Sequence, residues 1–120
     1  MRKLFAVIVG LMIVSAGSLR AQDVIAANPK TTKVTLDNEH VRVFEATLEP
    51  GLKENPHSHP ASIIYVVAGG TVRSHSPDGT TKESTYTAGQ TVYREPLTHW
   101  SENIGTTTIR LVVVELKPQK

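Results

Sequence analysis

Three histidines, His57, His59 and His99, have the types and spacing that best fit metal chemistry in this sequence. His57 and His59 lie one residue apart in the stretch NPHSHPASIIYVVAGG, and residues i and i+2 of a strand point to the same face. Both imidazoles can therefore reach one ion. His99, arriving from another strand, would complete a set of three nitrogen ligands with positions left for water or a substrate.

This set of ligands is compatible with a divalent transition metal, Fe, Ni, Cu, Zn or Mn, and the sequence does not specify which. An isolated His-x-His pair also has a second interpretation, because two exposed loop histidines beside Pro56 and Pro60 would give the same pattern. No general base is evident beside the three histidines, so the sequence assigns no catalytic residue.

The elements that must position these histidines read as β-strands. Short β-branched segments alternate with turn signals such as Pro77-Asp78-Gly79, and no window of 11 residues after the N-terminal leader carries a helical apolar stripe. An all-β domain, a sandwich or barrel, is predicted over 34–117, preceded over 22–33 by an arm that is extended or forms an edge strand. The predicted strands are 33–36, 41–48, 62–67, 71–76, 81–87, 91–95, 98–103 and 108–117.

The N-terminus has the three-part pattern of a secretory signal peptide. A positive start, Met1-Arg2-Lys3, precedes an apolar run over 4–14 and a segment of small and polar residues. The apolar run is too short for a transmembrane helix, which needs about 20 apolar residues. We therefore expect residues 1–21 to be cleaved after Ala21, and the mature protein to be periplasmic or secreted, with an uncleaved anchor as the alternative.

Removal of this leader changes the charge of the chain. The formal net charge of +2 includes Arg2, Lys3 and Arg20, whereas no acidic residue precedes Asp23. The mature chain, with ten basic and eleven acidic residues, is therefore close to neutral, and no basic patch indicates nucleic-acid binding. The chain contains no cysteine, which excludes structural disulfides and a lipoprotein anchor.

Two stretches resemble the motifs of the cupin superfamily. Gly51, His57-Ser-His59 and Gly70 fit G-x5-H-x-H-x(3,4)-E-x6-G, and the stretch from Gly89 through Pro96 and His99 to Asn103 fits G-x5-P-x-G-x2-H-x3-N. The resemblance covers about residues 34–116. It implies a small double-stranded β-helix, or jelly-roll barrel, in agreement with the strand pattern. It also implies that His57, His59 and His99 are the metal ligands.

The departures from these motifs affect the function that can be expected. Ile63, or Ser62 if one residue is deleted, stands where the family usually has a metal-binding glutamate, and the second motif is one residue short and lacks its internal glycine. The site is then either a three-histidine centre, as in some cupin dioxygenases, or an apolar pocket that has lost its metal. Glu54 and Glu95 lie near the motifs, where either could support or replace a ligand or simply be solvated.

Several other residues receive an expectation from their position. Tyr65 and Tyr93 either place a phenol in the barrel or fill its core, and Trp100 should point away from His99. His75 is expected to be exposed and His40 to lie in a turn. The resemblance gives Asn103 a structural role in the turn of the second motif.

The sequence thus predicts an exported, metal-binding cupin, with a small-molecule dioxygenase-type oxidoreductase as the leading interpretation. The alternatives are a non-catalytic cupin that binds a small molecule or metal, as a sensor or store, and a cupin isomerase or lyase. We expect a small-molecule ligand in the barrel, no nucleic acid, no membrane contact once the leader is cleaved, and a homodimer. The apolar strand over 108–117 would be partly covered by the second copy.

Overall fold

The computed structural model describes residues 22–120, so the predicted signal peptide lies outside the described residues. Within them, the only helix is α1 (Val24–Ala27), and no helix is long and apolar enough to cross a membrane. The strands are β1 (Thr32–Asp37), β2 (Val41–Leu48), β3 (His57–His59), β4 (Ser62–Ala68), β5 (Gly70–His75), β6 (Thr81–Tyr86), β7 (Thr91–Arg94), β8 (Leu97–Asn103) and β9 (Ile109–Leu116).

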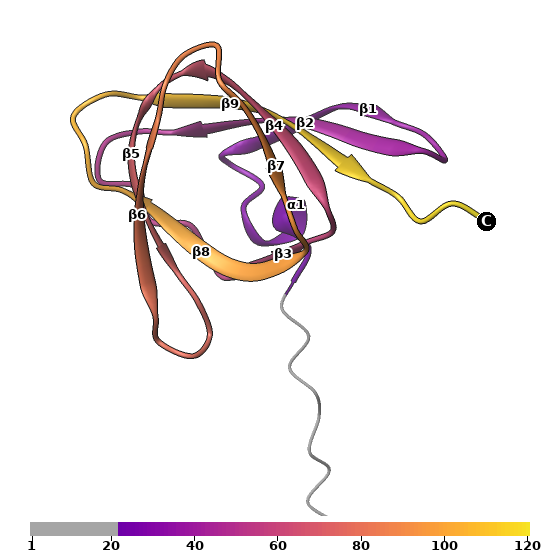
Figure 1. The fold of residues 1–120 in the computed structure, drawn as a ribbon, viewed down its shortest axis with the longest axis horizontal. Coiled ribbons are helices and arrows are strands. Elements are labelled where there is room, and N and C mark those ends of the chain that lie inside the picture. The colour runs from indigo at the N-terminus through magenta and orange to yellow at the C-terminus, as the bar shows by residue number, and fades with distance from the viewer. Residues whose placement is uncertain (1–21) are drawn as a thin grey trace, which may run out of the picture.

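Nine strands form two antiparallel sheets that curve around a common interior. One sheet has the order β1-β2-β9-β4-β7 and the other the order β3-β8-β5-β6. In Figure 1 the strands enclose a central space, with β3 and β8 on one side and β2 and β9 on the opposite side. This arrangement is the predicted double-stranded β-helix, and the eight predicted strands each occur within one residue of the expected bounds.

The core lies between the sheets and follows the two-residue period of the strands. In β4, Ser62, Ile64 and Val66 are buried, whereas the residues between them are exposed. The same alternation places Phe44 of β2 and Val113 of β9 inside. Side chains at the inward positions of each strand therefore either build the core or line the site.

The arm predicted over 22–33, expected to be extended or an edge strand, instead contains α1. Asp23 caps this helix, with its carboxylate accepting a hydrogen bond from the backbone N–H of Ile25 at 3.1 Å. Val24 is only 1% exposed and belongs to the core. A helix of four residues is too short to show an apolar stripe, which explains why the pattern did not reveal it. A bridge between Asp23 and Ser58 joins this segment to β3.

The turn predicted at Pro77-Asp78-Gly79 is confirmed and connects β5 to β6. Gly79 has a φ of 86° and its N–H donates to the carbonyl of Ser76 at 3.0 Å. A residue with a side chain is strained at this φ, whereas glycine is not. The adjoining β5 then pairs with β8, the strand that carries His99.

Candidate metal centre

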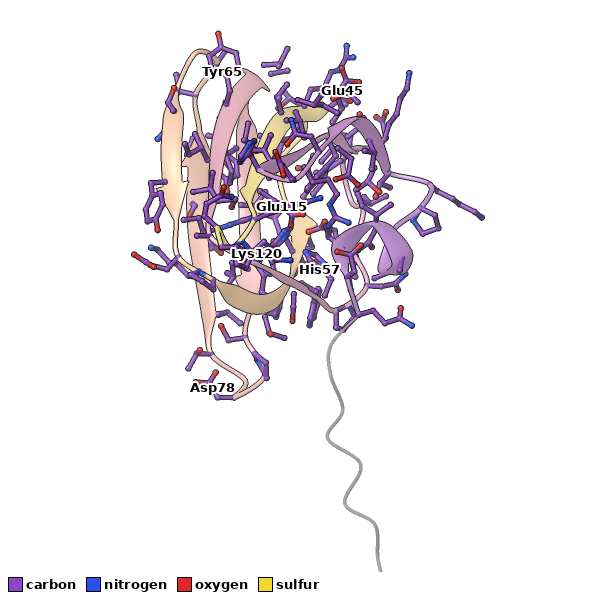
Figure 2. All side chains as sticks on the ribbon, turned by 90° about the vertical axis from the view of Figure 1, so that its right-hand side faces the viewer. Glu45, His57, Tyr65, Asp78, Glu115 and Lys120 are labelled. Carbon is purple, nitrogen blue, oxygen red and sulfur yellow. The ribbon has the colours of Figure 1, made fainter. Side chains whose placement is uncertain are left out.

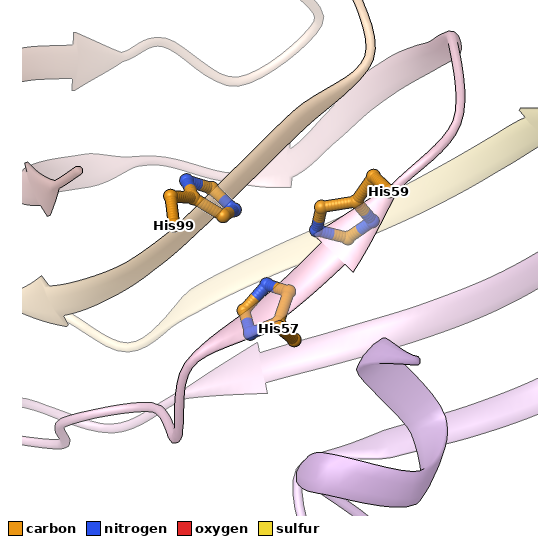
Figure 3. A group of neighbouring side chains, drawn as sticks. All are labelled: His57, His59 and His99. Carbon is orange, nitrogen blue, oxygen red and sulfur yellow. The ribbon is translucent and has the colours of Figure 1, made fainter. Parts of the chain in front are cut away.

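The three histidines converge on one point inside the barrel. In the antiparallel pair of β3 and β8, His57 stands directly opposite His99, so their side chains share a face. His59 shares this face two residues further along β3. Each histidine offers a ligand atom, and these atoms lie within 4.8 Å of one another. Figure 3 shows the three imidazoles turned toward one another from the two strands.

All three imidazoles are buried, with exposed fractions of 0% for His57, 6% for His59 and 5% for His99. Ser58, between the first two, is directed elsewhere, because its hydroxyl lies 2.6 Å from that of Thr98. The interpretation as exposed loop histidines is therefore wrong. Metal binding by the three histidines remains a prediction. The geometry specifies that the ion would lie between them.

The Nδ1 atoms of the β3 histidines are held from outside the cluster. The Nδ1–H of His57 donates to the backbone carbonyl of Asn55 at 2.7 Å, and Nδ1 of His59 lies 3.0 Å from Oε2 of Glu115. A proton on Nδ1 leaves the lone pair on Nε2, the atom on the opposite side of the ring. This is how outer hydrogen bonds orient metal-binding histidines.

His99 is oriented in the same manner by a hydroxyl. Its Nδ1 lies 2.9 Å from Oγ of Ser74 in the neighbouring strand β5. The Nε2 atoms of His99 and His57 are buried and have no hydrogen-bond partner. Buried polar atoms without partners are rare in proteins, and neutral imidazole nitrogens in this state are what a divalent metal ion would bind.

Two further groups brace these contacts. The side chain of Asn28 accepts from the N–H of Asn55 at 2.8 Å and donates to the carbonyl of Asn55, which holds His57, at 3.3 Å. Nε of Arg42 donates to Oε1 of Glu115 at 2.8 Å, and its Nη1 donates to Asp23 at 3.1 Å. Glu115 is 2% exposed, so its charge is compensated by Arg42 on one side while it orients His59 on the other.

Burial keeps the three imidazoles neutral. It lowers the pKa of His57 to about 4 and that of His99 to about 2, with the positive charge of Arg94 adding to the effect in both. Burial also lowers the pKa of His59, although the hydrogen bond that His59 donates to Glu115 opposes this. A protonated imidazole cannot bind a metal, so all three are ready to do so at neutral pH.

The cluster borders two neighbouring cavities that share lining residues. The inner cavity, of about 40 Å³, is lined by the three histidines together with Glu54, Tyr86 and Arg94. The outer cavity, of about 370 Å³, shares Tyr86, Arg94 and His99 with it. The inner volume suits a few atoms, and the outer volume lies in the range of small-molecule sites.

Glu54, one of the two carboxylates considered from the sequence, lies at the inner cavity. It is half-buried, and loss of hydration raises its pKa to about 7, so that it can exchange a proton near neutral pH. Glu95 is exposed. Neither joins the three-histidine group among the described residues, so no carboxylate replaces the motif glutamate there. The sequence assigned no general base beside the histidines, and Glu54 is the carboxylate that lines the same cavity as they do.

The position of the missing glutamate is resolved by the burial of β4. Ile63 is 37% exposed and points outward, whereas Ser62 is fully buried and its hydroxyl has no partner. Ser62 is paired in register with Glu115 of β9 on one side and Arg94 of β7 on the other. The shifted alignment, with Ser62 at the inward position, is therefore the one that the structure supports.

The aromatic candidates from the sequence are mostly on the surface. Tyr65 and Tyr93 are 48% and 57% exposed, so neither fills the core, and Tyr93 only borders the outer cavity. The tyrosine inside is Tyr86, which the sequence did not single out. Trp100 stacks on His75 with ring centroids 3.7 Å apart, outside both cavities.

Of the three remaining predictions from the sequence, one is wrong and two are confirmed. His75 is half-buried by the stack on Trp100 and lies 3.1 Å from Glu102, so the prediction that it is exposed was wrong. His40 is exposed in the turn before β2, as expected. Asn103 donates to the carbonyls of Leu48 and Thr107, each at 2.8 Å, which confirms its structural role.

Several residues of the site escaped the sequence analysis, although two of them carried a signal. Glu115 lies an even number of residues from Ile109 and Val113 in β9, so its side chain points inward as theirs do. Arg94 is related in the same way to Val92 in β7. A charged residue at an inward position of an apolar strand indicates a functional group, because charges are seldom buried without a partner. Asn28 and Ser74 are brought to the site only by the fold.

No known family model matches the chain, and no curated protein does. Solved structures do match. A cupin domain from Bordetella pertussis Tohama I is 26% identical, with 85% of this chain and 100% of that chain covered and a TM-score of 0.67. An RmlC-like cupin from Methanocaldococcus jannaschii is 21% identical over 73% of this chain and 82% of its own, with a TM-score of 0.56. A protein from Thermotoga maritima described as a predicted oxalate decarboxylase is 21% identical over 72% and 79%, with a TM-score of 0.54.

Proposed function

The chain is a cupin by fold, and we propose that it binds a divalent transition metal through His57, His59 and His99 and acts on a small molecule beside that ion. The observation that carries this proposal is the pair of buried Nε2 atoms, on His57 and His99, that have no partner while the Nδ1 atoms are held from outside. A purely structural histidine would use both nitrogens or expose one to water.

The leading reaction class is that of a dioxygenase-type oxidoreductase. Three neutral ligands leave coordination positions for dioxygen or a chelating substrate, and a bound ion would supply Lewis acidity and a template there. The candidates are Fe, Ni, Cu, Zn and Mn, of which Fe best suits oxygen chemistry at such a site. The chain's own contribution is to hold the imidazoles neutral and oriented and to exclude water from the inner cavity.

A specific observation also favours a second candidate, an isomerase or lyase. Glu54 borders the inner cavity together with the three histidines, and its pKa of about 7 fits a group that takes and returns a proton. Oxygen consumption with turnover supports the oxidoreductase, whereas turnover without oxygen that is lost in Glu54→Gln supports the second candidate. A non-catalytic binding protein would bind the metal and a ligand but would show no turnover, with or without oxygen.

We further propose that the protein acts outside the cytoplasm, as the leader pattern over 1–21 indicates. A homodimer is proposed on the outer face of the larger sheet. A row of apolar side chains crosses all five strands there in register, and its members are Leu36, Val43, Val114, Ile63 and Tyr93. Analytical ultracentrifugation of the mature protein measures whether it is a dimer.

The experiment that tests the metal site begins with metal analysis of the mature protein purified from its own compartment, since overexpression elsewhere can load the wrong ion. Addition of the correct ion to metal-free protein should raise the melting temperature. At a hundredfold excess of the ion over Kd, the folded state should gain about 2.7 kcal/mol of stability. His57→Ala, His59→Ala and His99→Ala should each lose most of this shift.

His40→Ala and His75→Ala are the matched controls, because both histidines lie outside the cluster, and they should bind metal like the parent protein. If Fe, Ni, Cu, Zn and Mn all leave the melting curve of the parent unchanged, the metal site is absent. The barrel is then a metal-free pocket.

A further inference from the structure

Only four buried side-chain polar atoms of residues 22–120 lack a hydrogen-bond partner, and they belong to His57, His99, Arg94 and Ser62. A metal ion would account for the two histidine nitrogens. It would leave Nε of Arg94 unexplained, because a guanidinium carries no lone pair for a metal, and it would not explain Oγ of Ser62, which lines neither cavity. These two residues are direct neighbours, since Ser62 of β4 pairs with Arg94 of β7 in register.

Arg94 lies where the two cavities meet, and its charge is not neutralised within the described part of the chain. It lines both cavities, yet it forms no ion pair with Glu54 or Glu115, although both lie near enough to influence it electrostatically. The neighbouring Glu115 is instead engaged by Arg42 and His59. A half-buried guanidinium without a carboxylate partner is costly unless something else pairs with it.

The outer cavity has the charge expected of an entrance for anions. Arg94 and Lys82 are the cations among the residues that line it, and no aspartate or glutamate lines it. Hydroxyl groups of Ser74, Ser84 and Tyr86 add hydrogen-bond donors. Two positive charges without an opposing carboxylate in a cavity raise the local concentration of small anions.

We propose that Arg94 binds the carboxylate of a small substrate between the two cavities that it lines, beside the three histidines. A planar guanidinium pairs with a planar carboxylate through two parallel hydrogen bonds. The inner cavity of about 40 Å³ admits a group of only a few atoms beside His99. The substrate class is therefore a small carboxylic acid with a second donor atom able to reach the ion, a part of the inference that rests on the proposed metal site.

Binding of two probes of the same shape tests this proposal. Pyridine-2-carboxylate and its neutral amide, pyridine-2-carboxamide, both chelate metals, but only the first carries a charge for Arg94. Their affinities for the Co(II)-loaded protein are measured by titration calorimetry and by the absorption of Co(II). In Arg94→Gln the carboxylate should bind about tenfold more weakly or worse, whereas the affinity for the amide should stay within about twofold.

Further variants separate charge from structure. Arg94→Lys, which keeps the charge but not the paired hydrogen bonds, should restore part of the affinity. Arg110→Gln is the matched control, because Arg110 is exposed and lines neither cavity, and it should bind both probes like the parent protein. Equal loss of carboxylate and amide binding in Arg94→Gln, or no loss, would overturn the proposal.

The metal-free protein separates this proposal from the metal site. If Co(II) fails to bind the parent protein, the proposed metal site fails, but the carboxylate should still bind more tightly to the parent than to Arg94→Gln. Equal binding to both metal-free proteins would then overturn the role of Arg94 as well.

Discussion

The carboxylate of Glu115 lies 3.0 Å from Nδ1 of His59, although the two residues are 56 positions apart in the chain. Both side chains are almost fully buried, at 2% and 6% exposure. In Figure 2, Glu115 lies within the barrel near His57, whereas Glu45 lies at the periphery. The contact fixes the ring of His59 and increases the basicity of its free nitrogen, so that Glu115 is a positioning residue for the metal centre.

Glu115→Gln should weaken metal binding by about 10- to 100-fold, because the amide keeps the shape but removes the negative charge that supports His59. Titration of the metal-free protein with Zn(II) or Co(II) measures this loss. Glu45→Gln is the matched control, since Glu45 is an exposed residue of β2, and it should leave the affinity unchanged. An affinity in Glu115→Gln equal to that of the parent would show that the contact does not act on the metal centre.

Restoring a carboxylate to β4 should distinguish the two alignments of the first motif. Ser62→Glu places a carboxylate on the inward face beside Glu115 and Arg94, where it can become a fourth ligand and tighten Mn(II) binding. Ile63→Glu places it on the exposed outer face, so Mn(II) affinity should not change. Calorimetry with Mn(II) compares the two variants. Tighter binding in Ile63→Glu alone would contradict the register of β4.

The metal-free protein should lose stability as the pH falls below the unfolded histidine value of about 6.5. Because the folded pKa values of His57 and His99 are about 4 and about 2, the unfolded chain binds more protons than the folded chain in this range. For each of these two histidines, the free energy of unfolding should therefore fall by up to about 1.4 kcal/mol per unit decrease in pH. Urea unfolding between pH 7 and pH 5, with a chelator present, measures the slope. His99→Asn should make it shallower.

Glu54 should oppose this trend. Its folded pKa of about 7 exceeds the ordinary value of 4.5, so between these values the folded chain holds a proton that the unfolded chain releases. Its contribution to stability is present at low pH and is lost as the pH rises through about 7. Glu54→Gln should consequently steepen the loss of stability between pH 7 and pH 5. An unchanged slope would mean that Glu54 is not buried enough to titrate abnormally.

Arg94→Met should stabilise the metal-free protein by about 1 kcal/mol or more, because it removes a half-buried charge without an ion pair and keeps the length of the side chain. Thermal unfolding of the mature protein measures this. Arg110→Met, at an exposed position, should stay within about 0.5 kcal/mol of the parent. Destabilisation by Arg94→Met would indicate that this arginine supports the fold rather than a ligand.

Mass spectrometry of the exported protein should show a chain that begins near Gln22. The charged start, the apolar run and the small residues that follow are the physical basis of this expectation. A chain that retains Met1 and stays in the cytoplasm would contradict both the cleavage and the location outside the cytoplasm.

The sequence by itself determined the strands and the three histidines. Strand positions follow from alternation and from turn residues such as Gly79, which are local properties that survive without knowledge of the partners. The pairing of His57 and His59 on one face follows from the same two-residue period. The third member, His99, was placed by its motif and then found directly opposite His57.

Only the tertiary structure decided what surrounds these histidines. Glu115, Ser74 and Asn55 hold the three imidazoles, and of these only Asn55 is near its histidine in sequence. Whether Ser62 or Ile63 faces inward depended on the register of β4 against β9, since a shift of one residue exchanges the two faces. The unpaired charge of Arg94 is likewise a tertiary property, because a charge lacks a partner only once the folded chain has placed every carboxylate.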